Sequence, residues 1–66
     1  MTLREAAKGV VTAYGGAYHI GFENPEIGED QTMFSADNLK DLEMLWKDFC
    51  EENGFRKNSV TYVERV

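Results

Sequence analysis

The chain has 66 residues, a formal net charge of −5, and 42% hydrophobic and 12% aromatic residues. This length predicts one domain (residues 1–66), and the apolar content argues against intrinsic disorder. No run of about 18 apolar residues is present, which argues against a membrane partner. The first residues lack the apolar core of a secretory signal, so we expect a cytoplasmic protein.

Residues 3–14 predict the first helix. Thr2 and Glu5 match a capping box, in which each side chain bonds to a free backbone N–H of the first turn. Apolar residues then recur with the period of a helix, and Gly15-Gly16 marks its end. The segment from Val10 to Tyr14 is rich in β-branched residues, so a strand there is the alternative.

Two strands are expected after this helix. Residues 17–23 alternate polar or small residues with three large apolar ones, Tyr18, Ile20 and Phe22. Gly21 indicates a bulge or a close approach by the first helix. Residues 24–30 contain Pro, Gly and three acids and predict an acidic loop, after which residues 31–34 return antiparallel to the first strand.

The main helix is predicted over about residues 36–53. Ser35 is expected to cap its start, with Phe34 and Leu39 forming a hydrophobic staple. Asn53-Gly54 marks its end, and Phe55 is placed for an apolar contact back onto the last turn. One arc of about 140° forms the predicted core face, made of Leu39, Leu42, Leu45, Trp46, Phe49 and Cys50.

Residues 59–66 predict the last strand, with Val60 and Tyr62 on one face and Thr61 and Val63 on the other. Apolar residues on both faces favour a central place in the sheet. The predicted fold is therefore α+β with the order α-β-β-α-β. A three-stranded, mainly antiparallel sheet packs against the main helix and the N-terminal helix.

Acidic residues are concentrated in the middle of the chain. Residues 23–52 hold ten acids and two lysines, giving −8, whereas the other residues hold two acids and five bases, giving +3. The face of the main helix opposite its core stripe combines four carboxylates with one large apolar side chain, namely Asp37, Asp41, Asp48, Glu51 and Met44. Such a field attracts basic surfaces and repels nucleic acid.

These charges predict a non-catalytic protein that docks on a basic protein partner and does not bind nucleic acid directly. The predicted partner-binding residues are Asp37, Asp41, Met44, Asp48, Glu51, Glu26, Glu29 and Asp30. In its sharpest form the hypothesis is nucleic-acid mimicry, because carboxylates along a helix resemble the phosphates of a strand. Small acidic proteins of phages and mobile elements that inhibit nucleases offer an analogy of size and charge. The alternative for this surface is a solvated face that only aids solubility.

Catalysis is not expected, because convergent chemical groups are few. His19 is the only histidine and Cys50 the only cysteine, and the helical period places Cys50 on the core face. No cofactor motif is present. A metal site is not expected either, since residues 24–35 place glycine at the fifth rather than the sixth position of a calcium loop and Ser35 at the twelfth.

A second hypothesis is a nucleic-acid-associated domain or nuclease-like enzyme that uses His19 and the sheet face. Its cations would be Arg4, Lys8, Arg56, Lys57 and Arg65. Its stacking platform would be Tyr18, Phe22 and Tyr62, if that sheet face were open. A third hypothesis is a homo-oligomer that buries Met44 and one sheet edge.

Overall fold

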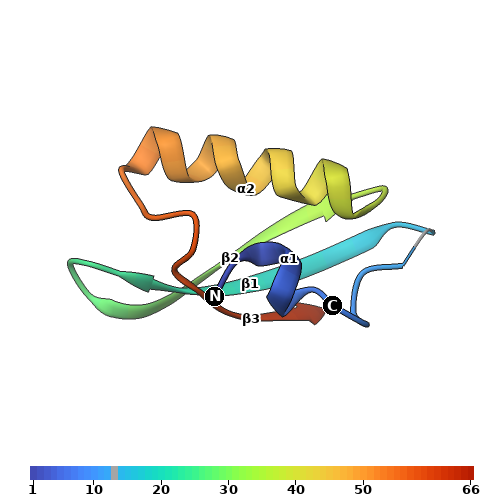
Figure 1. Ribbon diagram of the computed structural model, residues 1–66, viewed down its shortest axis with the longest axis horizontal. Helices are drawn as coiled ribbons and strands as arrows, with labels where there is room; N and C mark the ends of the chain where they lie inside the picture. The colour runs from blue at the N-terminus through green and yellow to red at the C-terminus, as the bar shows by residue number, and fades with distance from the viewer. Residues whose placement is uncertain (13) are drawn as a thin grey trace.

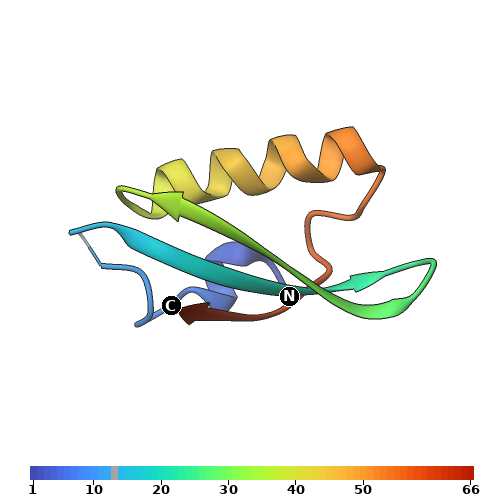
Figure 2. The ribbon, with the colours of Figure 1, turned by 180° about the vertical axis from the view of Figure 1, so that it is seen from behind.

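The computed structural model describes residues 1–12 and 14–66. Its elements are α1 (Leu3–Ala6), β1 (Gly16–Asn24), β2 (Gly28–Ala36), α2 (Leu39–Asn53) and β3 (Val60–Arg65). Helix α2 lies across one face of the three-stranded antiparallel sheet, and α1 lies beside β3 and contacts α2 (Figures 1 and 2). The predicted α+β fold, with the order α-β-β-α-β, is confirmed.

The core lies between α2 and the sheet. Most of its largest buried side chains come from β1 and from the predicted core face of α2, and β3 adds one; they are Tyr18, Ile20, Phe22, Leu42, Trp46, Cys50 and Val60. The Phe22 ring lies at the centre of an aromatic cluster, 5.4 Å from the Trp46 ring and 5.1 Å from the Phe55 ring between centroids. Edge and tilted contacts of this kind add to the free energy gained by burial alone. The alternation in β1 and the apolar stripe of α2 are both confirmed.

β1 is the central strand, in the order β2-β1-β3. Its hairpin with β2 pairs residues from Gly16↔Ala36 to Asn24↔Gly28, so the turn holds only residues 25–27. The Asn24 side chain explains this tight turn, because its Oδ1 accepts from the Glu26 N–H at 2.9 Å. The predicted loop over residues 24–30 was therefore too long.

β3 lies at an edge of the sheet, so the predicted central position was wrong. Val60 and Val63 are both buried, whereas Tyr62 is on the other face. A bulge causes this, since Phe22 pairs with Val60 and Gly21 pairs with Tyr62, which leaves one extra residue on β3. The predicted faces of the last strand were wrong for the same reason.

The first helix is much shorter than the predicted 3–14 and ends at Ala6. The capping box forms, with the Glu5 N–H donating to Thr2 Oγ1 at 3.2 Å and the Thr2 N–H donating to Glu5 Oε1 at 2.9 Å. The Thr2 N–H and the Thr2 hydroxyl both donate to Glu5 Oε1, and these two bonds hold the pKa of Glu5 below its ordinary value. Gly9 then takes a left-handed φ of 80°, which ends the helical path. Residues 10–12 form neither helix nor strand, and residue 13 lies outside the described residues.

Helix α2 begins at Leu39, and its N-cap is Asn38 rather than Ser35. Asn38 Oδ1 accepts from the Asp41 N–H at 2.9 Å. Ser35 belongs to β2, because the antiparallel ladder continues as far as Ala36. The predicted staple at the helix start is therefore wrong, although both of its side chains pack against the core.

The predicted helix end is confirmed. Gly54 follows Asn53 in the left-handed conformation with a φ of 72°. The Phe55 N–H donates to the Cys50 carbonyl at 2.9 Å. The Phe55 ring then lies 5.7 Å from the Phe49 ring, which is the apolar contact back onto the last turn.

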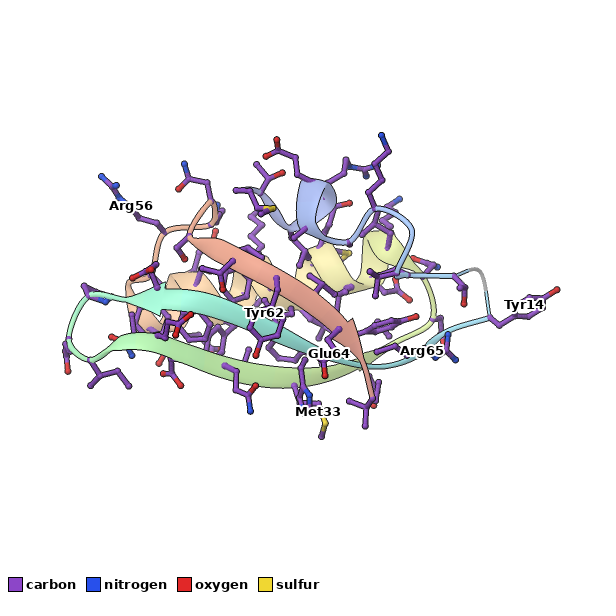
Figure 3. All side chains as sticks on the ribbon, turned by 90° about the horizontal axis from the view of Figure 1, so that it is seen from below. Tyr14, Met33, Arg56, Tyr62, Glu64 and Arg65 are labelled. Carbon is purple, nitrogen blue, oxygen red and sulfur yellow. The ribbon has the colours of Figure 1, made fainter. Side chains whose placement is uncertain are left out.

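On the face of the sheet opposite α2, the Tyr62 ring lies over Gly21 (Figure 3). A Cβ atom at position 21 would be only 2.0 Å from Tyr62 Cε1. The Tyr62 hydroxyl donates to Gln31 Oε1 at 2.7 Å, so the side chain reaches from β3 across β1 to β2. The sheet does have a bulge beside Gly21, but its extra residue lies on β3, and the close approach at Gly21 is by Tyr62 rather than by the first helix.

We expect Asn38→Ala to lower the free energy of unfolding by about 1 kcal/mol, because it removes the side-chain acceptor of the first turn. The matched control, Ser35→Ala, should change it by less than about 0.5 kcal/mol. Urea unfolding of the two variants measures both values. A larger loss in Ser35→Ala would place the helix start where the sequence suggested.

We expect Gly21→Ala to lower the free energy of unfolding by about 1–3 kcal/mol, because the new methyl group displaces the Tyr62 ring. In a Tyr62→Ala background the same change should have little cost, since that ring is gone. A double-mutant cycle in urea should therefore give a coupling of at least about 0.5 kcal/mol. Additive effects would contradict the packing of Tyr62 on Gly21.

Candidate docking groove

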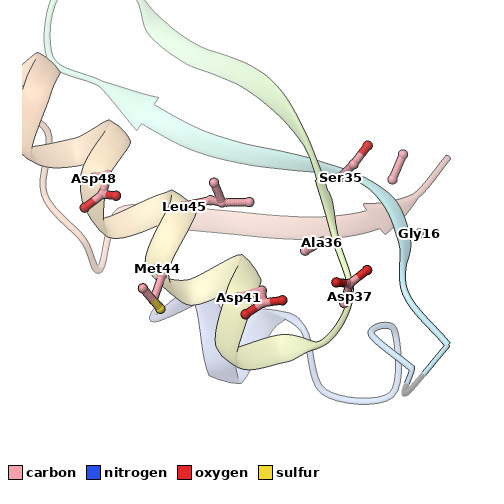
Figure 4. A pocket seen from close by; sticks show the side chains of 9 residues that line it. Gly16, Ser35, Ala36, Asp37, Asp41, Met44, Leu45 and Asp48 are labelled. Atoms are coloured by element: carbon pink, nitrogen blue, oxygen red, sulfur yellow. The ribbon is translucent and has the colours of Figure 1, made fainter.

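A groove of about 610 Å³ separates α2 from the sheet where β1 begins and β2 ends (Figure 4). The lining residues are Gly16, Ala17, Ser35, Ala36, Asp37, Asp41, Met44, Leu45 and Asp48. We call it the acidic groove. It brings together four of the eight predicted partner-binding residues, namely Asp37, Asp41, Met44 and Asp48.

Helical geometry explains how α2 lines this groove. Asp41 and Asp48 are two turns apart, about 10.5 Å along the axis, and therefore point to the same side. Met44 lies between them and is 57% exposed, so it forms the outer rim, whereas Leu45 is partly buried and forms the floor. Asp37 precedes the cap of α2 and reaches the groove because β2 runs up to that point.

No pattern in the sequence indicates the strand side of the groove. Gly16, Ala17 and Ala36 have small side chains, and they meet there only because β1 and β2 pair in this register. Small residues at these positions keep the space beside Leu45 open. The place of these small residues in the groove therefore depends on the tertiary fold, whereas the carboxylates and Met44 could be found from helical spacing.

The carboxylates of the acidic groove have no ion-pair partner within the described part of the chain. The ion pairs found there are Arg4–Glu43, at 2.6 Å, and Lys57–Glu51, at 3.5 Å, and both lie outside the groove. Three negative charges thus surround an apolar floor, and none of them forms an ion pair within residues 1–12 and 14–66. A concave wall of one charge sign concentrates its field and attracts opposite charge.

The opposite flank of α2 carries positive charge. A second hollow, of about 380 Å³, is lined by four cations and one carboxylate, namely Arg4, Lys40, Lys47, Lys57 and Glu43, besides apolar and neutral residues. We call it the basic flank. Met44 lines both hollows and so forms the ridge between opposite charges. The outward side of α2 is therefore more asymmetric in charge than the sequence analysis proposed.

The other four predicted partner-binding residues lie outside the acidic groove. Glu51 pairs with Lys57 near the end of α2. Glu26 is in the hairpin turn, and Glu29 and Asp30 belong to β2, where they line a separate hollow. The predicted set is thus divided between two regions, because the hairpin turn is at the far end of β2 from the groove.

His19 and Cys50 do not form a catalytic pair, because they lie on opposite sides of the sheet. His19 alternates with the buried residues of β1 and neighbours Met33 and Glu64 on the outer face. Cys50 is 1% exposed between α2 and the sheet. Burial raises the pKa of the Cys50 thiol to about 11, so the reactive thiolate is disfavoured.

Two of the three aromatic side chains considered for base stacking are in the core. Tyr18 and Phe22 are buried on the α2 side of β1, and Tyr62 alone lies on the outer face. Within residues 1–12 and 14–66, no group of three or more His, Cys, Asp or Glu side chains is arranged to hold a metal ion. Nor does any helix in these residues have the length and apolarity needed to cross a membrane.

Comparison of the chain with protein-family models, with curated proteins and with solved structures finds no match. No function is therefore transferred from another protein. The chemistry of the acidic groove and of the surfaces around it carries the functional argument.

The buried thiol predicts a pH effect on stability. Between pH 9 and about 11, Cys50 loses its proton in the unfolded chain but keeps it in the folded one, so stability falls as pH rises. The expected loss is about 1 kcal/mol per pH unit, and below pH 9 this group has no effect. Urea unfolding of the protein and of Cys50→Ala across this range measures the difference. Parallel pH curves would contradict the burial of the thiol.

Proposed function

We propose that this protein is a non-catalytic binding protein that docks on a basic surface of a partner protein through the acidic groove. The observation that carries the proposal is the set of three aspartates without a cation partner, arranged around an apolar floor. A lysine or arginine of a partner would place its aliphatic stem on Leu45 and its charged end beside Asp41 or Asp48.

Two features favour docking over a role in solubility alone. First, Met44 is a large exposed apolar side chain next to carboxylates, which is the composition of an interface with a polar rim. Second, the last turn of α2 contains Glu51 and Glu52 and no basic residue, although carboxylates there oppose the helix dipole. Helix stability therefore does not account for these two carboxylates.

The sharper form of the proposal is mimicry of nucleic acid, with the partner a nuclease or another nucleic-acid-binding protein. Asp37, Asp41 and Asp48 form a short row of negative charge that suits a groove built to hold phosphates. The basic flank would be repelled by the same partner. The two flanks together allow one orientation of α2 on a basic surface.

Affinity capture from cells of the native host, followed by titration of the retained protein, tests the proposal. The charge reversal Asp41→Lys/Asp48→Lys should weaken binding at least about tenfold, and added salt should also weaken it. The matched control, Glu23→Lys/Glu64→Lys, changes the net charge equally but on exposed residues of the outer face. Its affinity should stay within about twofold of the original, which is under 0.5 kcal/mol.

If both charge-reversed variants bind the partner with equal affinity, the acidic groove only aids solubility. Retention of RNA or DNA by the isolated protein in a low-salt gel shift would favour the nucleic-acid-associated alternative instead. Both outcomes contradict docking on a basic protein surface.

A further inference from the structure

The two edges of the sheet differ in what covers them. At the β3 edge, the Val60 N–H donates to the Met1 carbonyl at 3.1 Å, and the amino group of Met1 donates to the Val60 carbonyl at 3.0 Å. No strand within residues 1–12 and 14–66 pairs with the outer edge of β2, which forms the lower margin of the sheet in Figure 3. Residues 31–36 of β2 carry no charge. An uncharged edge strand of this kind is a template for an added strand.

Hydrogen bonds of β1 show which backbone groups of β2 point outward. The Glu23 N–H donates to the Ser59 carbonyl at 3.0 Å, and the Ala17 carbonyl accepts from the Val66 N–H at 2.9 Å. Successive residues of a strand turn their N–H and C=O groups to opposite edges. Odd-numbered residues of β1 therefore bond to β3, and even-numbered residues bond to β2.

The partners of these even-numbered residues in β2 are also even-numbered, as in Ile20↔Thr32. The odd-numbered residues of β2 therefore turn their N–H and C=O groups outward. The Gln31 N–H fits this pattern, because it is bonded to Asp30 Oδ1 at 2.8 Å instead of to a strand. Met33 and Ser35 have no partner among the backbone hydrogen bonds of the described residues. Within the described residues, the groups left free at Met33 and Ser35 thus lie in the part of the edge that leads into the acidic groove.

A strand added at Met33 and Ser35 would reach the acidic groove with every second side chain. Ser35 and Ala36 are themselves part of the groove lining. Side chains opposite each other on neighbouring strands share one face of the sheet. Residues of the added strand that align with Phe34 and Ala36 would therefore point toward α2, and the residues between them would lie beside Met33 on the outer face.

Charge complementarity favours a basic segment over a second copy of the chain at this edge. A second copy joined through antiparallel β2 strands would place both α2 helices on the same side of the joined sheet. The aspartates of the two acidic grooves would then face each other without cations between them. A strand with basic side chains toward α2 instead meets opposite charge at Asp41 and Asp48.

We propose that the outer edge of β2 accepts an extended segment of the basic partner as an added strand, with Lys or Arg at alternate positions in the acidic groove. This inference rests on the proposed function and states the form in which the partner is bound. Main-chain bonds to Met33 and Ser35 supply affinity, and the alternate basic side chains supply specificity.

The test uses a capped synthetic peptide of about seven residues in which Lys and Val alternate, the length of a typical strand. In an NMR titration, saturation should slow exchange of the Met33 and Ser35 amides at least about tenfold. The amides of Thr32 and Phe34 already belong to the β1–β2 ladder and should change little. A peptide of the same composition, with its lysines and valines in two separate blocks, should bind at least about tenfold more weakly.

Met33→Pro removes an outward N–H without removing a bond of the β1–β2 ladder. It should weaken binding of the alternating peptide at least about tenfold, whereas Met33→Leu, which keeps the N–H, should stay within about twofold. If Met33→Pro does not fold, the alternating peptide methylated on every second backbone nitrogen replaces it. Alternate backbone nitrogens can be methylated in two ways, and only one of them removes the N–H groups that face β2. The peptide methylated in that way should lose binding.

Binding without protection of the Met33 and Ser35 amides would overturn the added strand, and so would equal binding of the block peptide or no binding of the alternating one. Docking of a native partner through Asp41 and Asp48 would survive these results, so the two proposals fail separately. Protection of the same two amides in a peptide-free dimer, shown by sedimentation, would assign the edge to a second copy and would also overturn the inference.

Discussion

The packing of α2 on β1 is the interaction on which the rest of the structure depends. Phe22 of β1 meets Trp46 from the helix and Phe55 from beyond its end, and each helix turn adds a further buried residue. Full burial of one such side chain contributes about 1.5–3 kcal/mol, so rotating α2 by even one position is costly. This packing fixes which side of α2 meets water. The acidic groove and the basic flank follow from it.

The acidic groove combines two features that no single residue has, namely negative charge and an adjoining sheet edge with outward-facing backbone groups. Its helix wall supplies negative charge and an apolar contact at Met44. Beside its strand wall, Met33 and Ser35 turn backbone groups outward that have no partner within residues 1–12 and 14–66. Charge speeds and orients the encounter, and hydrogen bonds of a sheet edge hold an extended chain. On the proposed function, the opposite charge across Met44 would restrict the partner further, because a uniformly basic surface is attracted on one flank only.

Local patterns predicted the elements well where one preference was unopposed. The stripe from Leu42 to Cys50 and the stop at Gly54 needed only helical period and a left-handed glycine. Local patterns failed where two residues were equally good candidates for the same role. Ser35 and Asn38 are both good caps, and the length of the β1–β2 ladder decided between them. Helical spacing also places Lys40 and Lys47 on one side of α2, but this pattern was not used in the prediction. Only the approach of Arg4 to Glu43, which α1 brings about across the fold, is not encoded by local spacing.

A charge-exchange cycle at the interface with the captured partner tests whether the acidic groove is the docking surface. Asp48→Lys on this protein is combined with Lys→Glu or Arg→Glu changes at each basic residue of the partner surface. We expect at least one combination to recover about tenfold or more of the lost affinity, because an opposite-charge pair is re-formed with reversed signs. Independent losses at every basic position would show that Asp48 does not meet the partner, and docking through the acidic groove would be wrong.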